Sequence, residues 1–109
     1  MKAGDFIVIY VTCANGAEAE KISAALLDEK LIACANVLAP HTAHYSWKGK
    51  REKGSEVAII MKTRADLFEK VRATILTLHS YECPCIVSWP LTAGHGPFLD
   101  WIAAETTAG

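Results

Sequence analysis

The residues with the most evident chemistry lie in one short stretch, His79-Ser80-Tyr81-Glu82-Cys83-Pro84-Cys85. It contains an imidazole, a phenol, a carboxylate and two thiols. Two thiolates on either side of one proline suit Cu(I) or Zn(II), and His79 or Glu82 could supply a third ligand. The stretch lies between an expected helix and an expected strand, a place where rigid elements hold reactive groups on a loop. Cys83, Cys85, His79 and Glu82 are therefore a candidate metal site.

The cysteines also have a purely structural interpretation. Free cysteine behaves as a small apolar side chain and is among the most buried residue types. That interpretation is favoured for Cys13 and for Cys34, which is only a weak metal candidate. For the pair Cys83 and Cys85 both interpretations stay open. The other histidines are scattered in loops or at strand edges and are expected to be solvated: His41, His44 and His95.

A polar cleft is the second possibility for the same stretch. If the end of a strand carrying Lys62 met this junction, then His79, Tyr81 and Glu82 would add acid, base and anion-binding groups beside it. Alternatively, Glu82 and Lys62 would form an ion pair at a subunit boundary, and His79 would cap helical carbonyls. Trp47 is expected at the rim of such a cleft. The sequence has no GxSxG, HExxH, P-loop or GxGxxG motif, so no known catalytic motif supports an enzyme.

The hydrophobic pattern predicts the elements that position these residues. Asn15 and Glu18 form a capping box at the start of a first helix, and Thr63 is expected to cap a second. Pro40 interrupts one strand, and Lys48-Gly49-Lys50 supplies a hairpin turn. The expected strands are 6–13, 32–38, its continuation 41–47, 56–63 and 86–89, and the expected helices are 16–31, 64–79 and one from 97. This β-α-β-β-α-β order with a C-terminal helix predicts an α+β, ferredoxin-like fold.

The sheet is expected to be apolar on both faces. In the strand 56–63, Val57, Ile59 and Met61 alternate with Ala58 and Ile60, so each face receives apolar side chains. Two helices can cover only one face of such a sheet. Because large exposed apolar patches are rare in monomers, we expect the second face to pack in a closed homo-oligomer.

Composition limits the classes of function. The 109 residues fit a single domain over 1–109, and the net charge of −1 gives no electrostatic case for nucleic-acid binding. No apolar run reaches the roughly 18 residues that suggest a membrane span, and no signal peptide is recognisable. A cytoplasmic protein with reduced thiols is therefore expected.

Five segments follow one known pattern in order and spacing: 33–37 (ACANV), 45–50 (YSWKGK), 56–63 at its two ends (EV and MKT), 78–84 (LHSYECP) and 98–102 (FLDWI). In these segments the chain resembles the CutA divalent-cation tolerance family. The resemblance covers nearly the whole chain. It implies ferredoxin-like subunits whose sheets pack inward in a homotrimer, as in the similar PII signalling proteins.

The resemblance also implies a function, namely tolerance of divalent cations with copper binding and no settled catalytic activity. The alternative it suggests is a PII-like signalling or scaffold trimer that binds a small anionic ligand or a partner loop in intersubunit clefts. The positions that match the family's cleft are Trp47, Lys62, His79, Tyr81 and Glu82. Cys34 matches the family's cysteine in its ACxN segment.

One position departs from the family's pattern. Where the family usually has a glutamate after the proline, this chain has Cys85. A thiol in place of a carboxylate shifts the preference toward softer cations. This substitution points to Cu(I) at Cys83 and Cys85.

Overall fold

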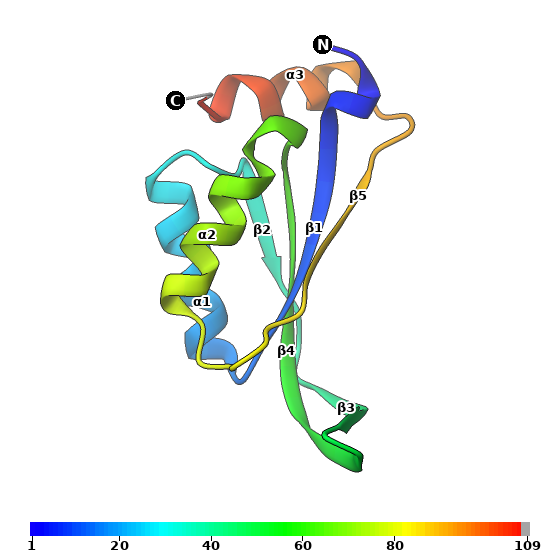
Figure 1. Cartoon of the computed structure of the whole chain (residues 1–109). Coiled ribbons are helices and arrows are strands. Elements are labelled where there is room, and N and C mark those ends of the chain that lie inside the picture. The colour runs from blue at the N-terminus through cyan, green and yellow to red at the C-terminus, as the bar shows by residue number, and fades with distance from the viewer. Residues whose placement is uncertain (108–109) are drawn as a thin grey trace.

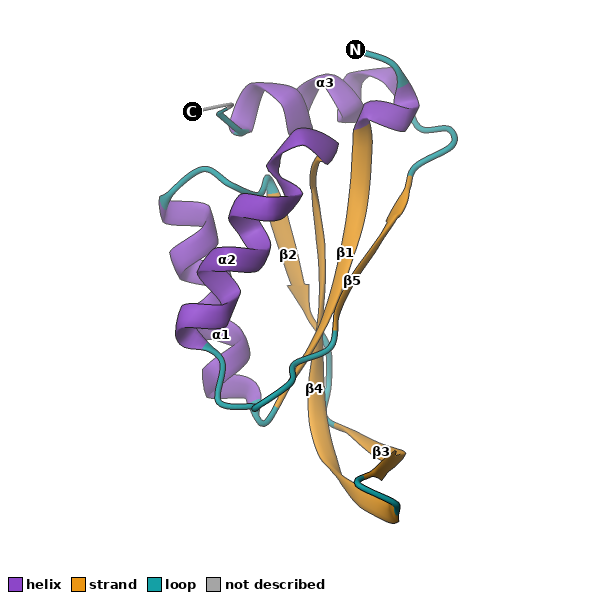
Figure 2. Ribbon diagram, in the orientation of Figure 1, coloured by secondary structure: helices purple, strands orange, loops and turns teal. Residues whose placement is uncertain are grey.

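An antiparallel sheet forms the centre of the molecule, as the computed structural model shows (Figures 1 and 2). The structure describes residues 1–107, so residues 108–109 of the single domain expected over 1–109 lie outside it. Strand order is β2-β4-β1-β5, and β3 pairs with β4. The strands are β1 (Phe6–Cys13), β2 (Cys34–Val37), β3 (His41–Trp47), β4 (Lys50–Arg64) and β5 (Ile86–Pro90).

The helices lie on one face and at one end of this sheet. Helices α1 (Gly16–Asp28) and α2 (Phe68–Leu78) lie against one face, while α3 (Gly96–Glu105) crosses the end from which β1 begins (Figure 1). Short 3-10 turns precede β1 and α2, at Ala3–Asp5 and Ala65–Leu67. The order of elements confirms the ferredoxin-like α+β fold with a C-terminal helix. Within residues 1–107 no helix has the length and apolarity needed to cross a membrane.

The main core lies between the sheet and the two long helices. Alternate residues of a strand share one face, so Ile9 and Val11 of β1 lie beside Ile59 and Met61 of β4. All four are fully buried. The helices complete the core with side chains at helical spacing: Ala19, Ile22, Leu26, Val71 and Ile75.

The opposite face of the sheet is only partly covered. Beneath α3, Phe6 and Ala33 pack against Leu99 and Ile102 in a second, smaller cluster. Farther along the sheet, one cross-strand row holds Cys34, Lys62, Val8 and Trp89, and the next holds Asn36, Ile60, Tyr10 and Val87. We call these two rows the outer face. Val87 is 48% exposed and Trp89 46%.

The first helix begins as predicted but ends earlier. The Asn15 side chain accepts a hydrogen bond from the Glu18 N–H at 2.9 Å, whereas the Glu18 carboxylate bonds to the N–H of Ala14 rather than that of Asn15. The helix was predicted to end near Leu31, but it ends at Asp28. Lys30 has a φ of +58°, and the Leu31 N–H returns to the Leu26 carbonyl. This left-handed residue with a 6→1 bond is a Schellman C-cap.

The prediction that Thr63 caps α2 is wrong. Thr63 remains in β4, fully buried, where its hydroxyl donates to the Leu31 carbonyl at 2.6 Å. Strand β4 is also longer than expected, because Lys48 and Gly49 adopt positive φ angles of 50° and 80° and turn β3 directly into it. The strand expected over 32–38 is shorter, covering Cys34–Val37. The β3–β4 hairpin projects away from the helices (Figure 1).

Candidate functional site

A pocket of about 580 Å³ lies where the corner between α2 and β5 meets the base of the β3–β4 hairpin. Its walls come from the end of β1, from both hairpin strands and from the corner itself. The corner is the stretch 79–85 singled out by its chemistry. The residues that line the pocket are Thr12, Ala43, His44, Tyr45, Trp47, Glu56, Ser80, Tyr81, Glu82, Cys83 and Cys85.

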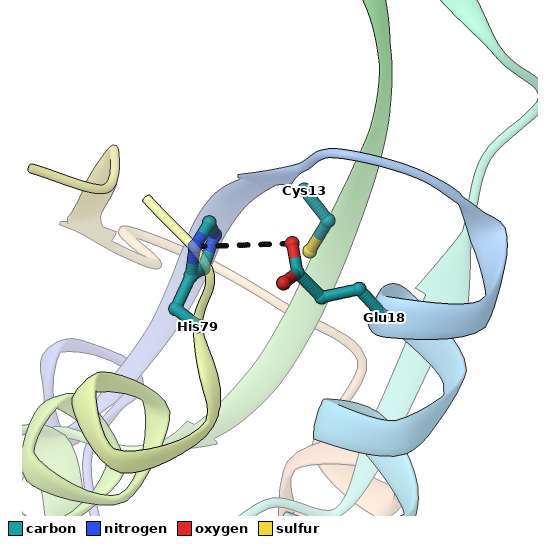
Figure 3. Close-up of side chains that lie close together, drawn as sticks. All are labelled: Cys13, Glu18 and His79. Atoms are coloured by element: carbon teal, nitrogen blue, oxygen red, sulfur yellow. Dashed lines mark ion pairs between the residues drawn. The ribbon is translucent and has the colours of Figure 1, made fainter. Parts of the chain in front are cut away.

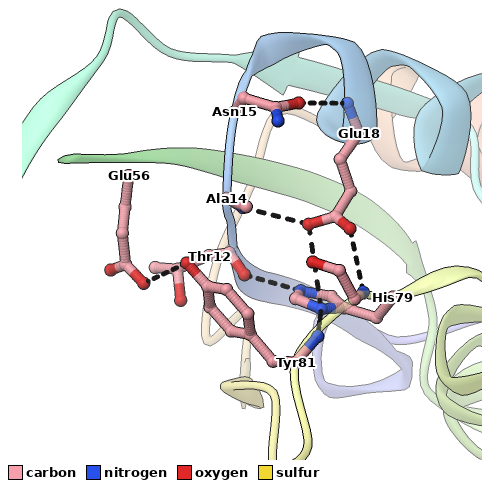
Figure 4. A network of polar contacts seen from close by, with 8 residues as sticks. Thr12, Ala14, Asn15, Glu18, Glu56, His79 and Tyr81 are labelled. Atoms are coloured by element: carbon pink, nitrogen blue, oxygen red, sulfur yellow. Dashed lines mark hydrogen bonds and ion pairs between the residues drawn. The ribbon is translucent and has the colours of Figure 1, made fainter. Parts of the chain in front are cut away.

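His79 fixes the start of the corner from behind the pocket. Its side chain is fully buried, and its Nε2 lies 2.8 Å from the carbonyl oxygen of Thr12. The N–H of Tyr81 donates to Nδ1 at 3.1 Å, so Nδ1 is the acceptor and Nε2 carries the proton that Thr12 accepts. Both ring nitrogens are therefore occupied by hydrogen bonds within the chain (Figure 4).

Glu18 ties the corner to the start of α1. Its carboxylate accepts the N–H of Ala14 and the N–H of Ser80, each at 2.9 Å (Figure 4). Burial alone would raise the pKa of this carboxyl, but these hydrogen bonds outweigh it. The pKa of Glu18 is accordingly held below its usual value. Glu18 is thus an ionised carboxylate at neutral pH with a structural task.

Tyr81 joins the corner to β4. Its hydroxyl donates to Glu56 at 2.8 Å, and its ring lies 4.8 Å from the His79 ring, centroid to centroid. Burial raises the pKa of the Tyr81 phenol strongly, and the Glu56 carboxylate raises it further. The phenol is therefore a neutral hydrogen-bond donor that fixes one wall of the pocket.

A second group of potential metal ligands comes from residues that do not line the pocket (Figure 3). One donor atom each from Cys13, Glu18 and His79 lies within 4.8 Å of the others, and residues 1–107 contain no other such group of three. Burial raises the pKa of Cys13 to about 11, so this thiol is protonated at neutral pH. Since hydrogen bonds also occupy the Glu18 carboxylate and the His79 ring, the group serves as a structural junction. Cys13 is a core residue, as its sequence position favoured.

The two thiols of the corner lie at the surface. Cys83 and Cys85 are both exposed, and both line the pocket. Partial burial raises the pKa of Cys85, with a further contribution from the charge of Glu56. The structure therefore places the pair in a solvent-accessible pocket and not in the core. It does not bring the pair together with His79, whose ring is buried and hydrogen-bonded.

The other predicted site residues divide between the pocket and the outer face. Trp47 and Glu82 line the pocket, and Glu82 lies 3.8 Å from the ammonium of Lys48. Lys62, predicted for the same cleft, lies on the outer face and donates to Asn36 at 3.1 Å. Within one chain Glu82 thus contacts Lys48 and Lys62 contacts Asn36, and the ion pair expected between Glu82 and Lys62 at a subunit boundary stays a prediction. Cys34 is also on the outer face, opposite Lys62 in the strand register.

Sequence reasoning missed several residues of the site. His44 lines the pocket, although it was expected to be merely solvated. Tyr45 and Glu56 were not named for the site, and neither was Glu18 behind it. The alternation along 41–47 could have placed Tyr45 and Trp47 on one side of their strand, two residues apart. No local signal could have joined Glu56 to Tyr81.

Comparison with known proteins identifies the family. The family model described as "CutA1 divalent ion tolerance protein" matches residues 7–105. The divalent-cation tolerance protein CutA of Archaeoglobus fulgidus is 44% identical over 94 residues, which are 86% of this chain and 91% of that one. Its counterpart from Pyrococcus horikoshii is 42% identical over 100 residues, which are 92% of this chain and 97% of that one.

The solved structures agree with this assignment. The crystal structure of the divalent ion tolerance protein CutA1 from Ehrlichia chaffeensis superposes with a TM-score of 0.89 at 33% identity. The match covers 95% of this chain and 97% of that one. The chain belongs to the CutA family of divalent-cation tolerance proteins.

Proposed function

We propose that this protein acts in the response to divalent metal ions and binds copper through Cys83 and Cys85. The observation that carries this proposal is that both thiols are exposed in one pocket. Soft thiolate ligands select Cu(I), which two donors suffice to hold. The carboxylates of Glu56 and Glu82 line the same pocket and add negative charge that favours a cation there.

The proposed set of ligands is narrower than the sequence suggested. His79 is not among the proposed metal ligands because both of its ring nitrogens are hydrogen-bonded. Cys34 is not among them either, because it lies on the outer face, away from the residues that line the pocket. Glu82, with a 73% exposed side chain, remains free to move and is the candidate for a third ligand.

We also propose that the protein assembles as a homotrimer through the outer face. The apolar side chains of Tyr10, Ile60, Val87 and Trp89 lie together there, and neither long helix covers them. A closed assembly of like subunits buries such a face on every copy. Thr12, which lines the pocket, belongs to the same side of β1 as Tyr10, so the pocket adjoins this face.

Binding, and not catalysis, is the role proposed for the pocket. The acid/base pair considered from sequence would need His79, whose buried ring already bonds to Thr12. The alternative of a small anionic ligand would use Lys62, which lies on the outer face. The cytoplasm is the proposed compartment, because a reducing environment keeps the two thiols available to a metal.

A copper titration tests the metal proposal. Reduced protein is titrated with Cu(I) in competition with a chromogenic chelator, for the wild type and the variants Cys83→Ser and Cys85→Ser. We expect one copper ion per chain, and a loss of affinity of at least about tenfold in each variant. Affinity should rise with pH, since the raised pKa of Cys85 means that the metal must displace a proton.

The control is Cys34→Ser, which removes a thiol outside the pocket and should leave the titration unchanged. Wild-type affinity and stoichiometry in Cys85→Ser would show that the pair is not the site.

A further inference from the structure

We propose that the aromatic part of the pocket binds an organic ammonium group, of the alkylamine class. Three rings line this part, those of Tyr45, Trp47 and Tyr81. Aromatic faces attract cations through the ring quadrupole. The carboxylates of Glu56 and Glu82 line the same walls and supply the opposite charge. Rings and carboxylates together form the usual surroundings of a bound alkylammonium ion.

The chain supplies its own ammonium at this position. The Nζ of Lys48 lies 5.5 Å from the centroid of the Trp47 ring and 3.8 Å from Glu82 Oε2. It thus makes the two contacts, one with a ring and one with a carboxylate, that a ligand ammonium would make. The Lys48 side chain is 69% exposed, so it can swing into solvent and leave both partners to a ligand.

The charges of the pocket select against other classes of ligand. Among its described lining residues are two glutamates and neither lysine nor arginine. An anion would face both carboxylates, while the ammonium of Lys48 beside them already lies 3.8 Å from Glu82 Oε2. A neutral ligand would gain apolar contact with the rings but no attraction to Glu56 or Glu82.

This inference does not rest on copper binding. The carboxylates serve both proposals, but the rings of the pocket take part only in amine binding and the thiols of Cys83 and Cys85 only in copper binding. The two proposals can therefore fail separately.

Three four-carbon probes of similar size test the charge requirement on the full chain, reduced and metal-free. n-Butylammonium, n-butanol and butyrate are titrated by NMR while the indole N–H of Trp47 is followed. We expect butylammonium to bind at least about fivefold more tightly than butanol, and butyrate not to bind. Equal affinity for butylammonium and butanol would overturn the proposal. Putrescine and a blocked lysine amide then separate a free diamine from a protein side chain as the natural source.

Variants test the position of the bound group. Trp47→Leu, followed through the ring signals of Tyr45 because its indole is gone, and Glu82→Gln, followed through the Trp47 indole, should each weaken butylammonium binding by about three- to fivefold. Lys48→Ala should strengthen it about twofold or more, because the competing internal ammonium is gone. Unchanged or weaker butylammonium binding in Lys48→Ala would overturn the placing of the ligand ammonium between Trp47 and Glu82.

Two controls complete the set. Trp101→Leu removes an exposed tryptophan of α3 outside the pocket and should have no effect. Cys85→Ser should leave amine binding unchanged whatever it does to copper, and a loss of amine binding in that variant would contradict the separation of the two sites.

Discussion

Glu18, which lies outside the pocket, connects two loops that hold one of the pocket's walls. Its carboxylate receives N–H groups from Ala14, before α1, and from Ser80, at the corner. A carboxylate can accept both because each of its two oxygens is an acceptor, whereas a side-chain amide has one acceptor oxygen and one NH₂ donor. The geometry of the corner therefore depends on one ionised side chain whose neighbours in space are far away in sequence.

The variant Glu18→Gln should lower the free energy of unfolding by about 2 kcal/mol, since an amide NH₂ would face an N–H donor. The folded-state pKa of Glu18 is lowered from 4.5, so its stabilisation is full above that value and is lost as pH falls through the folded-state pKa. The difference between wild type and variant in urea unfolding should therefore shrink on acidification.

The matched control for this change is Glu20→Gln, an exposed position of the same helix, which should stay within about 0.5 kcal/mol of wild type. A difference between wild type and Glu18→Gln that stayed constant from about pH 7 to about pH 3 would contradict the role given to the charge.

The network around the corner also explains what could not be predicted from the sequence at this scale. The bond from His79 to Thr12 spans 67 positions, and that from Tyr81 to Glu56 spans 25. Hydrophobic periodicity reports only which side chains are buried, and it carries no signal for such polar partners. Trp47, Tyr81 and Glu82 were placed at a cleft by resemblance, and they do line the pocket.

At the scale of elements, the hydrophobic periodicity and the capping residues predicted the order of strands and helices, but several predicted boundaries of these elements were wrong. The apolar run 6–13 became β1 with the predicted bounds. Threonine is a residue type suited to capping a helix, but the pairing of β4 with β1 continues one residue beyond Thr63, to Arg64. The burial of Thr63 in the sheet therefore overrides its local preference for a cap. The end of α1 was mispredicted because Lys30, and not a glycine, takes the left-handed position.

The left-handed conformation of Lys30 leads to a prediction about stability at the end of α1. Lys30→Gly should raise the free energy of unfolding by about 0.5–1 kcal/mol, because glycine adopts a φ of +58° without steric cost. Thermal and urea unfolding measure the change. The control Lys21→Gly, at an exposed interior position of the same helix, should instead lower stability by about 1 kcal/mol. A loss of stability in Lys30→Gly would show that the lysine side chain contributes more than its backbone costs.

At the scale of the whole molecule, the outer face is the proposed contact between subunits. Trp89→Glu places a charge within the proposed subunit contact, where burying it would be costly. We expect light scattering coupled to gel filtration to show a trimer for the wild type and smaller species for this variant. Leu76→Glu, a change at a 47% exposed position of α2, should leave the trimer intact. A wild-type monomer would contradict the proposed trimer, and a trimeric Trp89→Glu would place the contact elsewhere.

The molecule is 44 Å along its longest dimension. The turn Ala3–Asp5 and helix α3 lie at one end, while the hairpin projects from the other (Figure 1). The pocket lies at the base of that hairpin. A tether, dye or surface linkage attached beside Ala3–Asp5 would therefore leave the pocket open to solution. At the opposite end, a label attached to the hairpin tip at Lys48 and Gly49 would report whether the pocket is occupied without contacting the core.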